Sequence, residues 1–412
     1  SQGKALSPAF LVSNIREMFP EMEIRQCGDM QEPMELLELP GISLDYFLRG
    51  LAGEAYQDNA VFQELYSWYL QSPEYRILVK KLTEASFSER PSDKIGKTVA
   101  KILYGEISPY SATRLERFAA CAFAHFLQYG LKITERAEYE FRAMDMGNVM
   151  HMALEKFAAE VRKEGLDWAE LTEEERNRII DSCLDQVSAD YGNTILKSSA
   201  RNEYMIERTR RILRRTVWAL QEQLKHGAFR PEGFEVRFQG GRIDRVDIME
   251  EPENNRVYVK VIDYKTGNTS FDLLALYHGL QLQLMVYLDG ALQVEKRKYP
   301  DREIVPAGVF YYNVKDPMIQ EKIHADMESI NEQMLKKMKM NGLVQADDNM
   351  STKIDSTMAS IPVSLNRDGS FSKRSSVASR KQFDALGAYV RRKICDIRES
   401  ILDGNAAVEP YE

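Results

Sequence analysis

The feature that most constrains the fold is a strand, turn and strand pattern between Gly241 and Gly267, GRIDRVDIMEEPENNRVYVKVIDYKTG. Polar and apolar residues alternate from Arg242 to Met249, and β-branched and aromatic residues dominate Val257 to Tyr264. The polar residues 250–255 between these runs are typical of a turn. The stretch therefore predicts a β-hairpin.

Charged residues recur on one side of this hairpin. Side chains alternate between the faces of a strand, so Asp263 and Lys265 should share a face while Ile262 and Tyr264 take the other. A suitable register would bring Asp244 across from them. Two carboxylates suit a hard divalent cation, and a lysine beside them can orient a water, which is nuclease chemistry. The alternative is a solvated charge pair on an exposed strand.

Two helical patterns and a further strand carry other candidate residues. MGNVMHMALEKF places His151 and Glu155 on one helix face, and GLQLQLMVYL places Gln283 and Tyr287 four residues apart. Glu235, in FEVRF, lies on an expected strand before the hairpin. Each has a structural alternative, since a helical histidine can simply pack and a tyrosine can be buried with its hydroxyl satisfied.

Together the motifs GNVMHMALE, GRIDRVD, VIDYKTG and QLMVY resemble those of the RecB-type PD-(D/E)XK nucleases. They resemble most closely the nuclease domain of AddB-type subunits of bacterial AddAB helicase-nucleases. The resemblance implies an α/β fold with a restriction-endonuclease-like core, in which a mixed sheet is flanked by helices, with helical additions. The alternation of helices with a few strands agrees with that architecture.

The resemblance also implies site roles. The catalytic residues would be Lys265, Asp263, Asp244, Gln283 and Tyr287. One or two Mg²⁺ or Mn²⁺ ions would be held by His151, Asp244, Asp263 and a main-chain carbonyl near Tyr264. Glu155 and Glu235 remain additional candidates. Lys265 would position the attacking water, with Gln283 and Tyr287 holding either this lysine or a DNA phosphate.

The function implied by the resemblance is hydrolysis of DNA ends during double-strand break repair and recombination, in the cytoplasm and beside an AddA-type helicase-nuclease subunit. No membrane attachment is expected, because no apolar run is long enough to span a bilayer. The sequence contains no Walker-type phosphate loop, so the chain is not an ATP motor by itself. One alternative is a non-catalytic DNA-clamping or structural module, and another is a helical interaction protein whose motifs are coincidental.

The four cysteines bear on whether the chain could hold an iron–sulfur cluster. The four cysteines lie far apart, without metal-ligand spacing. The resemblance assigns Cys121 to a [4Fe–4S] cluster whose other three cysteines lie near the far C-terminus of such proteins. Because the sequence ends at AAVEPYE, we expect the cluster in a longer protein and not in this chain. Upstream of Cys121, Thr113 and Glu116 fit a capping box opening a helix.

A formal net charge of −8 requires any DNA contact to use local basic clusters. One predicted cluster is the helix face with Arg208, Arg211 and Arg215. The other is the loop SFSKRSSVASRK with Lys373 and Arg374, whose hydroxyl neighbours suit phosphate hydrogen bonds. Either cluster has the simpler interpretation of a solvated charged surface.

The chain is expected to fold in two regions, since 44% hydrophobic residues in 412 can bury a substantial core. Residues 1–105 predict short amphipathic helices, which by resemblance form the tail of an inactivated helicase-like region. Residues 106–412 would form the nuclease domain, truncated before the C-terminal cysteines, and the start at Ser1 suggests a fragment. Within this domain we predict single helices at 111–130, Leu273–Val294 and Gln382–Leu402, and a strand at Val305–Val314.

Overall fold

The computed structural model describes residues 10–22, 40–51, 60–87, 93–105, 111–134, 143–191, 199–319, 327–347 and 349–411. The chain divides into two compact units, Ser1–Pro91 and Ser92–Glu412, and each is described by itself. The first contains the helices α1 (Phe10–Met18), α2 (Pro40–Leu51), α3 (Ala60–Gln71) and α4 (Arg76–Ser86). Phe47 and Tyr69 are fully buried there among the apolar faces of α2, α3 and α4. Short amphipathic helices were predicted for this region.

The larger unit begins earlier than the predicted division at residue 105. Residues 93–95 hydrogen-bond with 404–406, as in the 2.8 Å bond from Ile95 N to Gly404 O. The helix α5 (Lys97–Tyr104) then packs against the C-terminal helix α15 (Arg380–Leu402). Because of these contacts α5 folds with the larger unit. The assignment of residues 1–105 to a helicase-like region stays a prediction.

The larger unit is built on a mixed sheet, which confirms the predicted α/β class. Its described residues form six strands in the order β1 to β6. They are β1 (Arg230–Phe238), β2 (Gly241–Glu251), β3 (Arg256–Lys265), β4 (Glu303–Asn313), β5 (Asn341–Gln345) and β6 (Val377–Ala378). Only β3 with β4 and β5 with β6 are parallel. The predicted hairpin is confirmed as β2 and β3, whereas β5 and β6 were not predicted.

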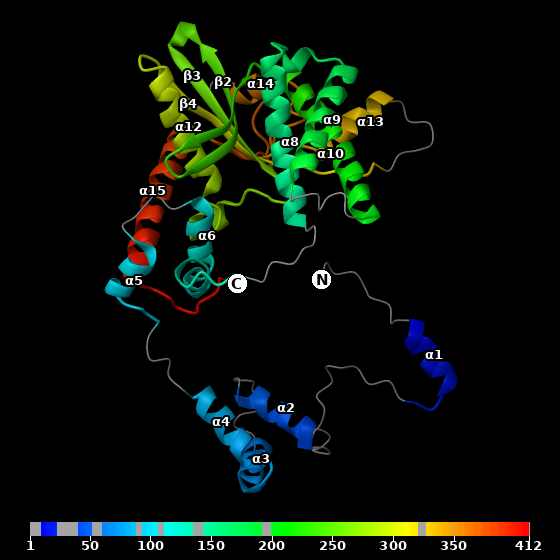
Figure 1. Ribbon diagram of the computed structural model, residues 1–412, viewed down its shortest axis with the longest axis vertical. Coiled ribbons are helices and arrows are strands. Elements are labelled where there is room, and N and C mark those ends of the chain that lie inside the picture. Colours follow the sequence, from blue (N-terminus) through cyan, green and yellow to red (C-terminus); the bar gives the residue numbers. More distant parts are fainter. Residues whose placement is uncertain are drawn as a thin grey trace. The chain divides into compact units, whose positions relative to one another are not determined.

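Helices cover both faces of this sheet (Figure 1). One face carries α8 (Ala143–Lys163), α9 (Glu173–Asp190) and α10 (Ala200–Lys225), and the other carries α6 (Ala112–Ala120), α12 (Gln283–Lys298) and α15. The strand β3 is buried on both sides, because Tyr258 and Ile262 pack under the first layer while Val259 and Val261 pack under the second. Smaller helices are α7 (Ala122–His125), α11 (Leu273–His278), α13 (Met327–Lys337) and α14 (Met350–Ile354).

Two helix predictions are wrong in the same way. The expected helix Leu273–Val294 is broken into α11 and α12, because Gly279 ends α11 in the left-handed conformation with φ 84°. The expected helix at 111–130 breaks at Cys121, whose backbone is extended, and ends in a π-helical turn at Phe126–Gly130. Helical periodicity continues across both breaks, so the pattern alone does not show them. In the described residues no helix is long and apolar enough to cross a membrane.

The capping box predicted for Thr113 and Glu116 is also wrong. The N-cap of α6 is Ser111, whose hydroxyl accepts a hydrogen bond from Arg114 N at 3.4 Å. Glu116 instead reaches a different helix, where its carboxylate accepts from the first backbone N–H groups of α12. Hydroxyl residues occur at both Ser111 and Thr113, and the helix starts from the earlier one.

Candidate active site

Three carboxylates lie in a row across the first three strands. The β1–β2 register on both sides of Asp244 aligns it with Glu235. The β2–β3 ladder begins at Arg245↔Ile262, one residue from Asp244 and Asp263, and the charge of Asp263 acts on Asp244. All three side chains are at least partly buried. Glu235 adopts a left-handed backbone with φ 50°, unusual for a residue other than glycine. The row places negative charge at the end of β3 where α8 passes.

The helix α8 adds His151 to this row. Its Nδ1 lies 3.4 Å from Asp244 Oδ2, and ligand atoms of His151, Glu235 and Asp244 all lie within 4.8 Å of one another. Among the described residues, this group has the side chains and spacing to hold a metal ion. Asp263 was predicted as a ligand but is outside the group, whereas Glu235 was an additional candidate and is inside it. Asp244 Oδ2 also accepts a hydrogen bond from Tyr264 N at 2.8 Å.

The protonation tendencies of these groups favour a bound cation. Burial and the neighbouring charge of Asp263 raise the pKa of Asp244 well above its usual range. Burial likewise raises the pKa of Glu235, although Arg242 opposes the shift. For His151, burial and then the charge of Lys265 lower the pKa, so the imidazole is neutral and able to ligate. Adjacent buried carboxylates with a neutral imidazole form a donor set that fits a divalent cation.

Lys265 completes the site from the end of β3. Its Nζ lies 2.7 Å from Asp263 Oδ2, so the two predicted catalytic residues share a face and form an ion pair. The same ammonium donates to Gln283 Oε1 at 2.6 Å, and it lies 5.3 Å from the centre of the Tyr311 ring. Burial raises the pKa of Asp263, and Lys265 opposes that shift. The pair leaves Lys265 anchored at two points beside the carboxylate row.

Gln283 and Tyr287 lie on the first turns of α12, as the i, i+4 spacing suggested. Gln283 Nε2 donates to the Tyr287 hydroxyl at 2.8 Å while its Oε1 accepts from Lys265. Gln283 is therefore the contact to Lys265, and Tyr287 orients Gln283. Burial raises the pKa of Tyr287, which keeps its hydroxyl protonated.

Two residues that contact the site were not assigned to it from the sequence. Arg242 pairs with Glu235 Oε2, on the edge of the candidate metal group. The carboxylate of Glu116, a residue of α6, lies at the N-terminus of α12. It is close enough to Lys265 and Asp263 for their charges to influence its pKa. The signal for Arg242 was present in GRID, two residues before Asp244 on the same strand. Glu116 had no local signal beyond the capping pattern that misplaced it. Glu155, the other additional candidate, is half-buried one turn after His151.

The predicted basic clusters lie on α10 and in the turn before β6, and neither contributes a ligand to the candidate metal group. Arg211 and Arg215, on α10, both pair with the Asp316 carboxylate, and Arg208 is exposed. In the second cluster, Lys373 and Arg374 are exposed in the turn before β6. A DNA-contacting role for either cluster stays a prediction.

The described cysteines do not gather into a cluster. Cys121 is half-buried at the end of α6, Cys183 is buried in the core, and Cys395 is exposed on α15. Cys27 lies outside the described residues. The part of the chain that the structure describes therefore does not supply the four thiolates of a [4Fe–4S] group.

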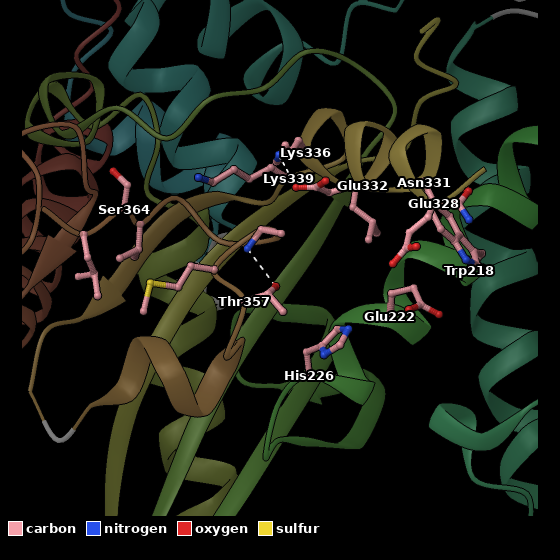
Figure 2. Close-up of a pocket in the computed structure, with 15 residues that line it drawn as sticks. Trp218, Glu222, His226, Glu328, Asn331, Glu332, Lys336, Lys339, Thr357 and Ser364 are labelled. Atoms are coloured by element: carbon pink, nitrogen blue, oxygen red, sulfur yellow. Dashed lines mark hydrogen bonds and ion pairs between the residues drawn. The ribbon is translucent and has the colours of Figure 1, made fainter. Parts of the chain in front are cut away.

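A hollow among the described residues lies elsewhere. It has a volume of about 1140 Å³ between α10, α13 and the segment 357–365. Figure 2 shows acidic Glu222, Glu328 and Glu332 on its wall together with Lys336 and Lys339. It contains no residue of the carboxylate row and no predicted site residue.

Comparison with known proteins agrees with the geometry. Residues 109–412 match the PD-(D/E)XK nuclease superfamily. Three similar proteins, each named as a subunit of an ATP-dependent helicase/deoxyribonuclease, come from Lachnoclostridium phytofermentans, Alkaliphilus metalliredigens and Clostridium acetobutylicum. Their identities are 38%, 34% and 31% over 99%, 100% and 100% of this chain. The chain spans only 37%, 38% and 38% of those relatives. With a match over most of its length and the matching site geometry, the chain belongs to the PD-(D/E)XK nuclease superfamily.

Proposed function

We propose that this chain carries a divalent-metal-dependent DNA nuclease site that hydrolyses phosphodiester bonds. The observation that supports it most directly is the arrangement of Asp244, Asp263 and Lys265 on one face of the hairpin, with the ammonium 2.7 Å from Asp263. Three neighbouring carboxylates beside one lysine carry more negative charge than the fold requires for its stability. This arrangement suits hydrolysis of a phosphodiester at a metal ion.

In this proposal His151, Glu235 and Asp244 hold Mg²⁺ or Mn²⁺ from the side of α8 and β1, with Asp263 and the Tyr264 carbonyl completing the site. When bound, such an ion activates water and neutralises charge that develops on the phosphodiester. Lys265 orients the attacking water, because its position is fixed by Asp263 and Gln283. Arg242 pairs with Glu235 and balances part of the negative charge.

The biological setting follows from the relatives' names and is part of the proposal. A protein named as a subunit of a helicase/deoxyribonuclease acts beside another subunit, so we assign this chain an AddA-type helicase-nuclease partner. The reaction would be exonucleolytic degradation of DNA ends in double-strand break repair and recombination, in the cytoplasm. The basic faces at Arg208, Arg211 and Arg215 and at Lys373 and Arg374 would contact the DNA backbone. A [4Fe–4S] cluster that includes Cys121 would need cysteines from outside this chain.

The test is degradation of end-labelled linear DNA with Mg²⁺ or Mn²⁺. Lys265→Ala and Asp263→Asn should each lower the rate by about a hundredfold or more, as expected for loss of a group that stabilises the transition state. Arg297→Ala is the matched control, because Arg297 is an exposed residue on the same helix as Gln283. Cleavage that survives both site substitutions would rule out these residues.

A parent chain that binds DNA without cleaving it would instead favour the non-catalytic DNA-clamping or structural module. Binding can be followed by fluorescence anisotropy of a labelled duplex in EDTA, where cleavage is absent. A chain with neither binding nor any metal dependence would leave only the interaction-protein alternative.

A further inference from the structure

We infer that Glu116 is a positioning residue for this site: its carboxylate fixes the first turn of α12 and thereby the Gln283 side chain that holds Lys265. The inference rests on the proposed nuclease function. It names a residue on a helix that carries no other member of the site. The geometry consists of three hydrogen bonds that link α6, α12 and the end of β3, and a fourth within α12.

The first contacts are at the start of α12. Glu116 Oε1 accepts hydrogen bonds from Leu282 N at 2.7 Å and from Gln283 N at 2.9 Å. The first N–H groups of a helix have no partner within the helix, and Leu282 at the N-cap has no side-chain oxygen to satisfy them. The cap is supplied from 166 positions earlier in the chain. A negative charge at this end of the helix also complements its dipole.

The second contacts join this turn to the reacting face. Gln283 is the first residue of α12, so a displacement of that turn moves its side chain directly. Its Oε1 accepts from Lys265 Nζ at 2.6 Å, while its Nε2 donates to the Tyr287 hydroxyl. Lys265 is thus anchored to Asp263 and to a side chain whose backbone is held by Glu116. Loss of the cap would release one of these two anchors.

Glu116 lies on a capped helix between buried neighbours. Its helix starts at the Ser111 cap, and Leu115 and Phe118 on either side are buried in the core beneath α12 and α15. Burial raises the pKa of Glu116, while the N–H groups of Gln283 and Leu282 oppose the shift. The carboxylate is outside the candidate metal group of His151, Glu235 and Asp244. Its contacts are with the helix terminus, so it acts through Gln283.

Three variants separate this role from general loss of structure. Glu116→Ala removes the acceptor, Glu116→Gln keeps an amide oxygen that accepts the same two N–H groups, and Thr113→Ala changes an exposed residue on the same helix. On end-labelled DNA, Glu116→Ala should lower kcat about tenfold with KM within about twofold, since an interaction used in the transition state lowers kcat. Glu116→Gln should stay within about threefold of the parent, and Thr113→Ala should equal it. A Gln variant as impaired as the Ala variant would overturn the inference.

A double variant tests whether Glu116 acts through Gln283. If it does, Glu116→Ala combined with Gln283→Ala should be no slower than Gln283→Ala alone, because the second change removes what the first one positions. Losses that multiply would mean that Glu116 acts independently, and the inference would fail.

Backbone hydrogen exchange gives a measurement that does not depend on cleavage. The Leu282 and Gln283 amides have Glu116 as their acceptor, so Glu116→Ala should speed exchange in peptides spanning this turn, with Thr113→Ala unchanged. Faster exchange together with a parent that cleaves no DNA would support the cap while rejecting the nuclease proposal. Unchanged exchange would reject the cap, whatever the activity.

Discussion

The two faces of the β2–β3 hairpin both bury charged side chains, but they treat the charge in opposite ways. On the face toward α8 to α10, Arg245, Asp247 and Lys260 are 1%, 0% and 3% exposed. Both Asp247 oxygens are occupied, since Arg245 Nε and Nη2 donate to them at 2.6 and 2.9 Å and Lys260 Nζ lies at 2.8 Å. Arg245 also lies 4.9 Å from the centre of the Trp168 ring. Every charge in this group has an opposite charge beside it.

The other face is turned toward α12 at Lys265, and His151 of α8 reaches it at the end of the strands. There the neighbours of a carboxylate include another carboxylate. Asp244 is aligned with Glu235 and feels the charge of Asp263. Its side chain is 13% exposed, and that of Lys265 is 27% exposed. Burial acts on both faces, yet the outcomes differ. Burial would raise the pKa of Asp247, but Arg245 and Lys260 lower it, whereas for Asp244 burial and Asp263 both raise the pKa.

One hairpin thus carries both a fully paired buried charge group and a group of adjacent carboxylates. A buried charge with a full set of partners is costly to break, because removal of one partner leaves an uncompensated charge in the core. Adjacent buried carboxylates cost stability in the folded protein and persist where a cation is bound. Residues one position apart in GRIDRVD therefore meet different surroundings, because alternate side chains face different layers.

The largest change in stability is expected when the paired group of Arg245, Asp247 and Lys260 loses its carboxylate. Asp247→Ala leaves two buried cations without their carboxylate and should lower the free energy of unfolding by about 3–5 kcal/mol. Asp289→Ala is the control, since its pair with Arg391 is exposed and should contribute less than about 1 kcal/mol. Urea unfolding followed by circular dichroism measures both. A loss for Asp247→Ala no larger than that of the control would remove the distinction between the faces.

A bound cation would supply the opposite charge that the carboxylate row lacks. At ten times its dissociation constant, Mg²⁺ or Mn²⁺ should raise the free energy of unfolding by about 1.4 kcal/mol, because it binds only the folded chain. Asp244→Asn should lose this gain, while Asp289→Asn should keep it. Calorimetric melting with the ion and with EDTA measures the difference. An equal gain in Asp244→Asn would place the ion elsewhere.

The sequence predicts features set by neighbouring residues better than contacts between residues that are far apart in the chain. The shared face of Asp263 and Lys265 follows from strand alternation over three residues, and the hairpin follows from two apolar runs and a polar turn. The break at Gly279 is invisible to periodicity, because helical spacing continues on both sides of it. Glu116 shows the limit most clearly: its partner is an N–H group at Gln283, 167 positions away, and only the packing of α6 against α12 brings them together. Resemblance to a family supplied His151 and Gln283, which local patterns could not distinguish from packing residues.

The smallest expected effect concerns pH, and it has opposite signs on the two faces. The folded pKa of Asp244 is raised by burial and by Asp263, so its ionised form costs stability at neutral pH, and that cost is relieved as pH falls through the raised pKa. Asp247 has a lowered folded pKa, so its contribution is present above the ordinary aspartate pKa and is lost only as pH falls toward the lowered value. In EDTA, Asp244→Asn should therefore be more stable than the parent at pH 7, and this advantage should shrink between pH 7 and pH 5. Urea unfolding at the two pH values measures it, with Asp289→Asn showing no such trend. An advantage that grows as pH falls would mean that Asp244 is held ionised by a partner, and the two faces would then be alike.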